Sequence, residues 1–127
     1  IMKRIHQIAT SIVFINLVVI VQANAQDLQR GEKIFEACAS CHALIKEEQS
    51  TVGPSLFGIF GRKAGAQDDY RYSPAMKKSG ITWNKQTLNN FLTDPQKLIP
   101  ANRMPFDGIP NLKDRNDLTA FMQVKFK

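Results

Sequence analysis

The amino-acid sequence predicts a small all-α domain with three main helices, short helical turns and long loops. Three observations support this fold class. Apolar residues recur at helical spacing in three separate stretches, and the alternation typical of a strand is never sustained after residue 25. Glycines also interrupt the apolar stretch 53–61, which would otherwise indicate a strand.

The first 25 residues have the pattern of an export signal. Lys3 and Arg4 form a short basic start, residues 8–21 form an apolar run, and a small-x-small cleavage site ends at Ala25. We expect cleavage after Ala25, a mature domain over residues 26–127 and a periplasmic location. An uncleaved membrane anchor is the alternative, because the apolar run is only slightly shorter than a membrane span.

Loss of the leader changes the charge of the chain. The mature domain has 15 basic and 11 acidic residues, a net charge of +4, and its basic residues are scattered. Such a surface favours association with an acidic partner, although a solvated basic face is the commoner explanation. Nucleic-acid binding has no support, because no basic run or aromatic-interleaved basic stripe occurs.

The first mature helix is expected over residues 28–39. Gly31, Ile34, Phe35 and Cys38 lie along one of its faces. This spacing places Cys38 at the end of the helix.

The middle of the chain carries two helix starts. Ser73 followed by Pro74 is typical of a capped helix start. A further helix is predicted from about Asn84, and Asp94 before a proline ends it. Residues 96–99 add one short helical turn.

The last helix is expected to open at about Asn111, with Asp114 three positions later in a capping-box-like pattern. Its apolar face consists of Leu118, Phe121 and Met122. We expect it to cross the first helix, with Gly31 allowing the two axes to approach near Phe121.

The stretch Cys38-Ala39-Ser40-Cys41-His42 is the most specific chemical signal in the sequence. Two cysteines two residues apart, followed directly by histidine, are typical of a c-type haem attachment site. Both sulfurs add to the haem vinyl groups, and His42 ligates the iron. A helical turn brings residues three apart onto one side, so Cys38 and Cys41 can face one edge of the macrocycle.

Two other interpretations of the cysteines are weaker. A structural zinc site needs four ligands, yet the chain has no further cysteine and only one other histidine, His6. A redox dithiol usually sits at a helix N-terminus, which lowers a thiol pKa, whereas these cysteines fall at a helix end. We therefore predict one covalent haem c. In a domain of this size such a large apolar group can serve as the centre of the core, so the haem-free chain should fold poorly.

A methionine is the expected second axial ligand, because the mature chain has no second histidine. Met122 fits the apolar face of the last helix and Met76 lies at a helix start, so both are interpreted as packing residues. Met104 lies in an irregular segment between two helices that can fold back over the haem. We predict that Met104 ligates the iron, and His/Met ligation raises the haem potential.

Taken together, these residues resemble a class I cytochrome c of the soluble mitochondrial and alphaproteobacterial type, over essentially all of 26–127. The resemblance implies that the Pro54 carbonyl holds the second ring nitrogen of His42, and that Arg62, Tyr72 and Trp83 surround the haem propionates. The likeness rests on Gly31 with Phe35, the haem motif, Gly53-Pro54-Ser55-Leu56, Gly61-Arg62-Lys63, Tyr72-Ser73, Gly80-Ile81-Thr82-Trp83, Ile99-Pro100 with Met104, and Leu118 with Phe121.

Several positions depart from that family pattern. Phe91 stands where relatives often carry tyrosine, and Asn102 where threonine is common, so we expect altered hydrogen bonds around the second ligand. Ala37, Gln96 and Pro110 occupy positions that are often lysine in mitochondrial relatives. Docking should therefore depend less on charge than it does there.

The resemblance implies a soluble one-electron carrier and not an enzyme. Ligation by both His42 and Met104 leaves no open position at the iron. Transient partners at the haem edge would be a membrane quinol–cytochrome c reductase and a terminal cytochrome oxidase or other acceptor, and we expect a monomer. The alternative is a peroxidase-like or ligand-sensing haem c protein with a labile sixth ligand. The lack of a distal histidine in the mature chain disfavours it.

Overall fold

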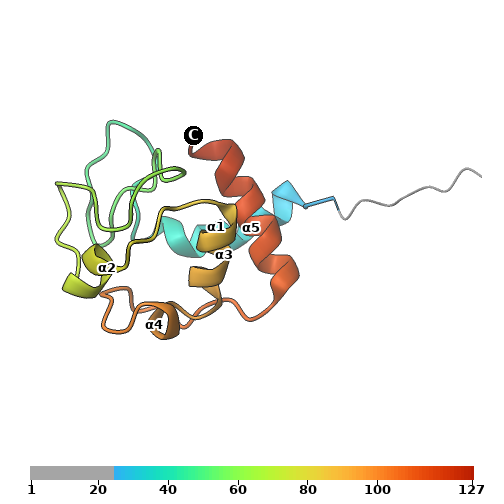
Figure 1. Cartoon of the computed structure of the whole chain (residues 1–127). Helices are drawn as coiled ribbons and strands as arrows, with labels where there is room; N and C mark the ends of the chain where they lie inside the picture. Colours follow the sequence, from blue (N-terminus) through green and yellow to red (C-terminus); the bar gives the residue numbers. More distant parts are fainter. Residues whose placement is uncertain (1–24) are drawn as a thin grey trace, which may run out of the picture.

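The computed structural model describes residues 25–127, and helices are the regular secondary structure of this range (Figure 1). The helices are α1 (Leu28–Ala39), α2 (Pro74–Lys78), α3 (Lys85–Thr93), α4 (Pro95–Leu98) and α5 (Leu112–Lys125). Residues 25–127 contain no strand, and one isolated bridge joins Lys63 to Thr82. The all-α fold class is confirmed. The predicted export signal lies, apart from Ala25, outside the described residues.

Three helices begin where the sequence predicts, and each has a side-chain cap. The side chains of Ser73, Asn84 and Asn111 each accept a hydrogen bond of 2.9–3.1 Å from the backbone N–H three residues later. The Asp114 carboxylate does not complete a capping box at α5, because it forms an ion pair with α1 instead. The helix α4 begins at Pro95, one residue before the predicted turn.

The helices α1 and α5 cross at Gly31, as predicted (Figure 1). A Cβ on Gly31 would lie 2.7 Å from the Asp117 carbonyl carbon and 2.8 Å from the Phe121 Cβ. Only glycine therefore permits this approach. Beside the crossing, the Phe35 ring packs with its centroid 5.6 Å from that of Phe121 and 5.0 Å from that of Phe126.

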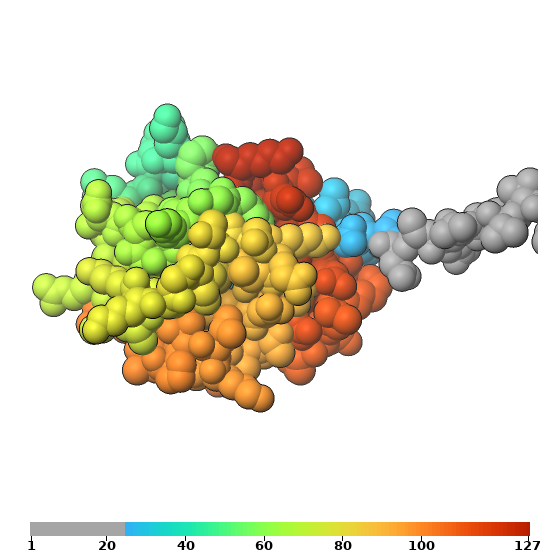
Figure 2. All heavy atoms as spheres, viewed as in Figure 1, coloured from blue at the N-terminus to red at the C-terminus, as the bar shows by residue number. Residues whose placement is uncertain are grey.

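Asp117 ties the start of α1 to α5. Its carboxylate accepts hydrogen bonds from the Asp27 backbone N–H at 2.9 Å and from Lys113 Nζ at 2.7 Å, and Arg30 Nε lies 3.9 Å away. Figure 2 shows the first described residues on the surface beside α5. The two ends of the domain are therefore held together by polar contacts as well as by the aromatic cluster.

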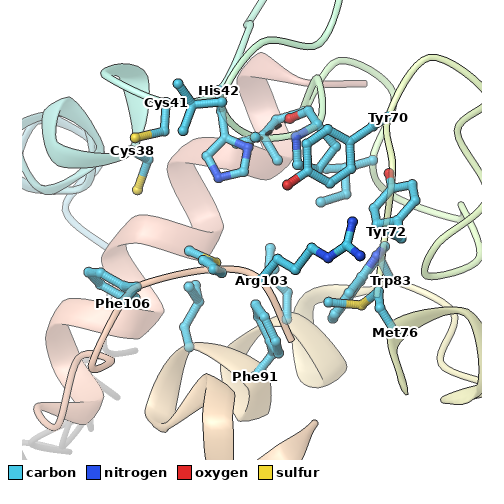
Figure 3. A pocket seen from close by; sticks show the side chains of 18 of the residues that line it. Cys38, Cys41, His42, Tyr70, Tyr72, Met76, Trp83, Phe91, Arg103 and Phe106 are labelled. Atoms are coloured by element: carbon cyan, nitrogen blue, oxygen red, sulfur yellow. Dashed lines mark hydrogen bonds between the residues drawn. The ribbon is translucent and has the colours of Figure 1, made fainter. Parts of the chain in front are cut away.

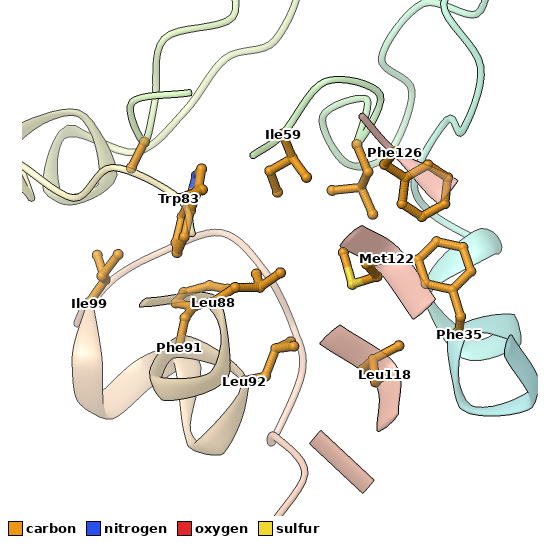
Figure 4. Packing of buried hydrophobic residues seen from close by; sticks show 12 residues of the cluster. Phe35, Ile59, Trp83, Leu88, Phe91, Leu92, Ile99, Leu118, Met122 and Phe126 are labelled. Atoms are coloured by element: carbon orange, nitrogen blue, oxygen red, sulfur yellow. The ribbon is translucent and has the colours of Figure 1, made fainter. Parts of the chain in front are cut away.

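The buried side chains fall into two groups that face each other (Figure 4). Trp83, Leu88 and Phe91 come from α3 and the loop before it, whereas Phe35 and Met122 come from α1 and α5. The candidate site lies between these groups. Within residues 25–127, no helix is long and apolar enough to cross a membrane.

Candidate functional site

A cavity of about 330 Å³ lies between α1, α3, α5 and the intervening loops. Most of its wall is made by apolar side chains. All eight residues that the sequence predicts for the site line this cavity: Cys38, Cys41, His42, Pro54, Arg62, Tyr72, Trp83 and Met104. Residues spread over much of the described chain are thus brought to one place.

The two cysteines lie together at one side of the cavity (Figure 3). Cys38 belongs to the last turn of α1, and Cys41 is the first residue after its C-cap. The backbone N–H groups of Cys41 and His42 both donate to the Cys38 carbonyl at 3.1 Å, which holds the two cysteines close together. Burial raises the pKa of the Cys38 thiol to about 11, and the neighbouring Cys41 adds to the rise. A reactive redox dithiol has a lowered thiol pKa, so that interpretation does not fit.

A zinc site does not fit either. Within residues 25–127 no group of three or more His, Cys, Asp or Glu side chains is placed to hold a metal ion.

The His42 ring is held in one tautomer by a backbone carbonyl. Its Nδ1 lies 2.7 Å from the Pro54 oxygen. Because a carbonyl can only accept, Nδ1 carries the proton and Nε2 keeps its lone pair. Burial lowers the pKa of His42 and the charge of Arg62 lowers it further, against the opposing effect of the Pro54 bond. The ring is therefore neutral at pH 7, the state in which imidazole binds a metal.

Gly53 sets how closely the chain approaches this ring. A Cβ on Gly53 would lie 2.6 Å from His42 Cε1 and 2.8 Å from its Nδ1. The Gly53 N–H donates to the Cys41 carbonyl at 2.7 Å, which fixes the two segments against each other. No prediction from the sequence gives Gly53 this role. The sequence signal for this role is the glycine directly before Pro54. Its φ is not positive, so the glycine is needed for the close approach to His42 and not for its backbone conformation.

Arg62, Tyr72 and Trp83 form the polar end of the cavity. The Arg62 guanidinium donates to the Ser55 carbonyl at 2.8 Å and to the Phe57 carbonyl at 3.2 Å. Burial raises the pKa of Tyr72, although the Arg62 charge opposes the rise. In Figure 3, Tyr72 and Trp83 lie on the side of the cavity away from the cysteines.

Three methionines line the cavity, so lining alone does not identify an axial ligand. Met122 lies in α5 with 3% of its surface exposed and belongs to the core. Met76 lies in the middle of α2 and packs against the hydrophobic core. Met104 lies in the irregular segment between α4 and α5.

The two departures expected near the second ligand, Phe91 and Asn102, differ in their surroundings. Phe91 lines the cavity and packs edge-on against Trp83, with ring centroids 5.2 Å apart. Asn102 does not line the cavity. Its side-chain amide hydrogen-bonds to the backbone of α4 and of the loop that carries Met104.

Comparison with known proteins decides the family. The family model for cytochrome c matches residues 28–124, which include the cavity-lining segments. The chain belongs to the cytochrome c family. Cytochrome c from Gibberella zeae is 42% identical over 102 residues, which cover 80% of this chain and 96% of that relative. Cytochrome c2 from Rhodoblastus acidophilus is 42% identical over 98 residues, which cover 77% and 92%.

Cytochrome c family members carry covalent haem c and transfer electrons, so this chain is a haem c electron carrier. The residues of the cavity fit that group. Cys38 and Cys41 offer two thiols on one side, His42 offers an unprotonated Nε2, and Arg62 offers a cation for anionic propionates. The apolar walls fit the macrocycle itself.

Proposed function

We propose that the chain is a soluble one-electron carrier whose haem iron is ligated by His42 and Met104. The hydrogen bond from His42 Nδ1 to the Pro54 oxygen carries this proposal, because it leaves Nε2 free for iron. When bound, haem c supplies an iron that takes up and returns one electron. The protein would hold the ring of His42, offer Met104 as the second iron ligand and exclude water with its apolar walls.

The same residues support a carrier over a peroxidase-like or ligand-sensing protein. An enzyme acting on peroxide needs an open position at the iron and a distal acid or base. With Met104 as ligand the position is filled, and His42 is the only histidine after residue 25.

We further propose a periplasmic monomer that docks transiently at the haem edge. Its donor would be a membrane quinol–cytochrome c reductase, and its acceptor a terminal oxidase or another acceptor. The leader pattern over residues 1–25 supports export with cleavage after Ala25. The net charge of +4 on residues 26–127 supports steering towards acidic surfaces.

Substitution of Met104 tests the ligation. Met104→Ala should abolish the thioether-to-iron charge-transfer absorption of the oxidised protein. It should also lower the midpoint potential by a sizeable part of the roughly 0.8 V range that axial ligands span. Optical spectroscopy with a redox titration measures both.

Met76→Ala and Met122→Ala are the matched controls and should keep the absorption. If either of them loses it while Met104→Ala keeps it, the ligand assignment moves to that methionine. Ready binding of carbon monoxide by the unsubstituted reduced protein at neutral pH would argue against a carrier with a filled sixth position.

A further inference from the structure

A buried amide holds the segment that carries Met104. Asn102 is 7% exposed, and its Nδ2 donates to the carbonyls of Pro95 and Ile99, both at 2.9 Å. Its Oδ1 accepts from the Met104 backbone N–H at 2.8 Å. Two carbonyls face the nitrogen and one N–H faces the oxygen, so only this orientation of the amide satisfies all three partners.

A second amide binds the same segment from the surface. Gln96 is exposed, and its Nε2 donates to the Asn102 carbonyl at 3.1 Å and to the Met104 carbonyl at 3.3 Å. The Phe106 N–H donates to the Met104 carbonyl as well, at 2.9 Å. Both backbone polar groups of Met104 are therefore hydrogen-bonded within its own loop.

These two amides act on Met104 and not on the contents of the cavity. Met104 lines the cavity, whereas Asn102 and Gln96 do not. Between them Ala101 has φ of 61°, a left-handed conformation that is unfavourable for a residue with a Cβ. The loop thus keeps a strained residue in place, and the amide hydrogen bonds oppose its relaxation.

We propose that Asn102, assisted by Gln96, is a positioning residue that keeps Met104 at the haem iron and resists its replacement by outside ligands. The inference rests on the proposed ligation by His42 and Met104. An outside ligand reaches the iron only in molecules whose Met104 has moved away. Its apparent affinity is therefore scaled by the population of that open state.

Imidazole titration of the oxidised holoprotein at constant neutral pH measures that population. Loss of the thioether-to-iron absorption reports displacement of Met104. Asn102→Ala leaves the Met104 N–H without its acceptor, whereas the Pro95 and Ile99 carbonyls keep their backbone donors. The variant should therefore bind imidazole at least about tenfold more tightly. Gln96→Ala removes one partly buried and one exposed hydrogen bond, and it should bind imidazole about two- to fivefold more tightly. Both variants should keep the absorption when imidazole is absent.

Asn111→Ala is the matched control. It removes an amide of the same type that caps α5 and makes no hydrogen bond to the Met104 segment. It should lower the global stability but leave the imidazole affinity unchanged. Amide hydrogen exchange gives a second readout, because the Met104 N–H should lose protection in Asn102→Ala and keep it in Asn111→Ala.

Unchanged imidazole affinity in both Asn102→Ala and Gln96→Ala would overturn the proposal. An equal gain in Asn111→Ala would overturn it too, because the effect would then follow global stability. If Asn102→Ala does not accumulate as holoprotein, the imidazole affinity of Gln96→Ala is compared with that of Asn111→Ala, and equal affinities overturn the proposal. Absence of the thioether absorption from the unsubstituted protein would instead overturn the His42/Met104 ligation, which separates the two failures.

Discussion

Because Gly53 has no Cβ, the His42 ring can pack directly against its backbone. The space that a Cβ would occupy is already filled by ring atoms of His42, and the Gly53 backbone is itself bonded to Cys41. The neutral tautomer of His42 depends on a carbonyl one residue further along, that of Pro54. Local backbone geometry here controls which ring nitrogen of His42, the proposed iron ligand, carries the proton.

Gly53→Ala should therefore disturb the haem site more than the fold. The added methyl group forces the His42 ring or the 53–54 backbone to shift, with an expected loss of about 1 to 3 kcal/mol in unfolding free energy. The visible spectrum and midpoint potential of the oxidised and reduced protein should change with it.

Gly58→Ala provides the comparison. Gly58 has φ of 66° and no atom within 4 Å of the position of a Cβ, so the substitution introduces only backbone strain of about 1 kcal/mol. Its haem spectrum should match that of the unsubstituted protein. Identical spectra for the two variants would contradict the role given to Gly53.

Residues that act through local pattern could be predicted, and residues that act through distant contacts could not. Cys38, Cys41 and His42 form one contiguous motif. Arg115 shows the opposite case: it is 8% exposed and donates to Asn89 and to the carbonyls of residues 109 and 110. An arginine in a helix of mixed polarity is expected to face solvent, so no sequence signal indicates this contact.

Among the elements, the α1–α5 pair combines close backbone packing with a buried carboxylate. Burial alone would raise the pKa of Asp117. Its pKa is nevertheless held below the ordinary value by hydrogen bonds from Lys113 and the Asp27 N–H, and by the charges of Lys113 and Arg30. A carboxyl with a lowered native pKa stabilises the fold above its unfolded pKa of about 3.9. That stabilisation is lost as the pH falls through the native pKa.

Asp117→Asn should accordingly lower the free energy of unfolding at pH 7 by about 1 kcal/mol. The difference from the unsubstituted protein should shrink as the pH falls below about 4, because protonation then removes the same charge. Denaturant titrations between pH 7 and pH 3 measure this convergence.

Asp114→Asn is the control for that series, because Asp114 forms its ion pair with Arg30 at the surface and should contribute about 0 to 1 kcal/mol. Stability differences for Asp117→Asn that stay constant over the whole pH range would contradict the assignment.

Helix starts were predictable because single residues specify them. Ser73, Asn84 and Asn111 each carry a side-chain acceptor that satisfies a free backbone N–H. Long loops offer no comparable signal. The loop over 53–64 is held by backbone bonds from Gly61 to Trp83 and from Ala64 to Ile81, at 2.7 and 2.8 Å, between residues about twenty positions apart.

At the scale of the whole molecule, the cavity interrupts the core. At about 24 cal/mol per Å³, leaving about 330 Å³ empty would cost up to about 8 kcal/mol, which is comparable to the total stability of a typical domain. The haem is therefore expected to be part of the fold and not an addition to a finished one.

A chain produced without haem, for example as Cys38→Ala with Cys41→Ala, should lack cooperative unfolding. Its far-UV circular dichroism should show reduced helix content, because α1, α3 and α5 lose the surface that they share. The holoprotein measured under the same conditions is the reference. A haem-free chain with an equally sharp thermal transition at the same temperature would show that the core does not need the group.

The crossing of α1 and α5 also sets the order in which the domain can be completed. The Phe35 side chain of α1 packs on Phe126, the residue directly after α5. Until α5 has docked on α1, the cavity lacks the wall that Leu118 and Met122 provide. Before that step the thiols of Cys38 and Cys41 lie beside an open side of the cavity, where a haem can enter.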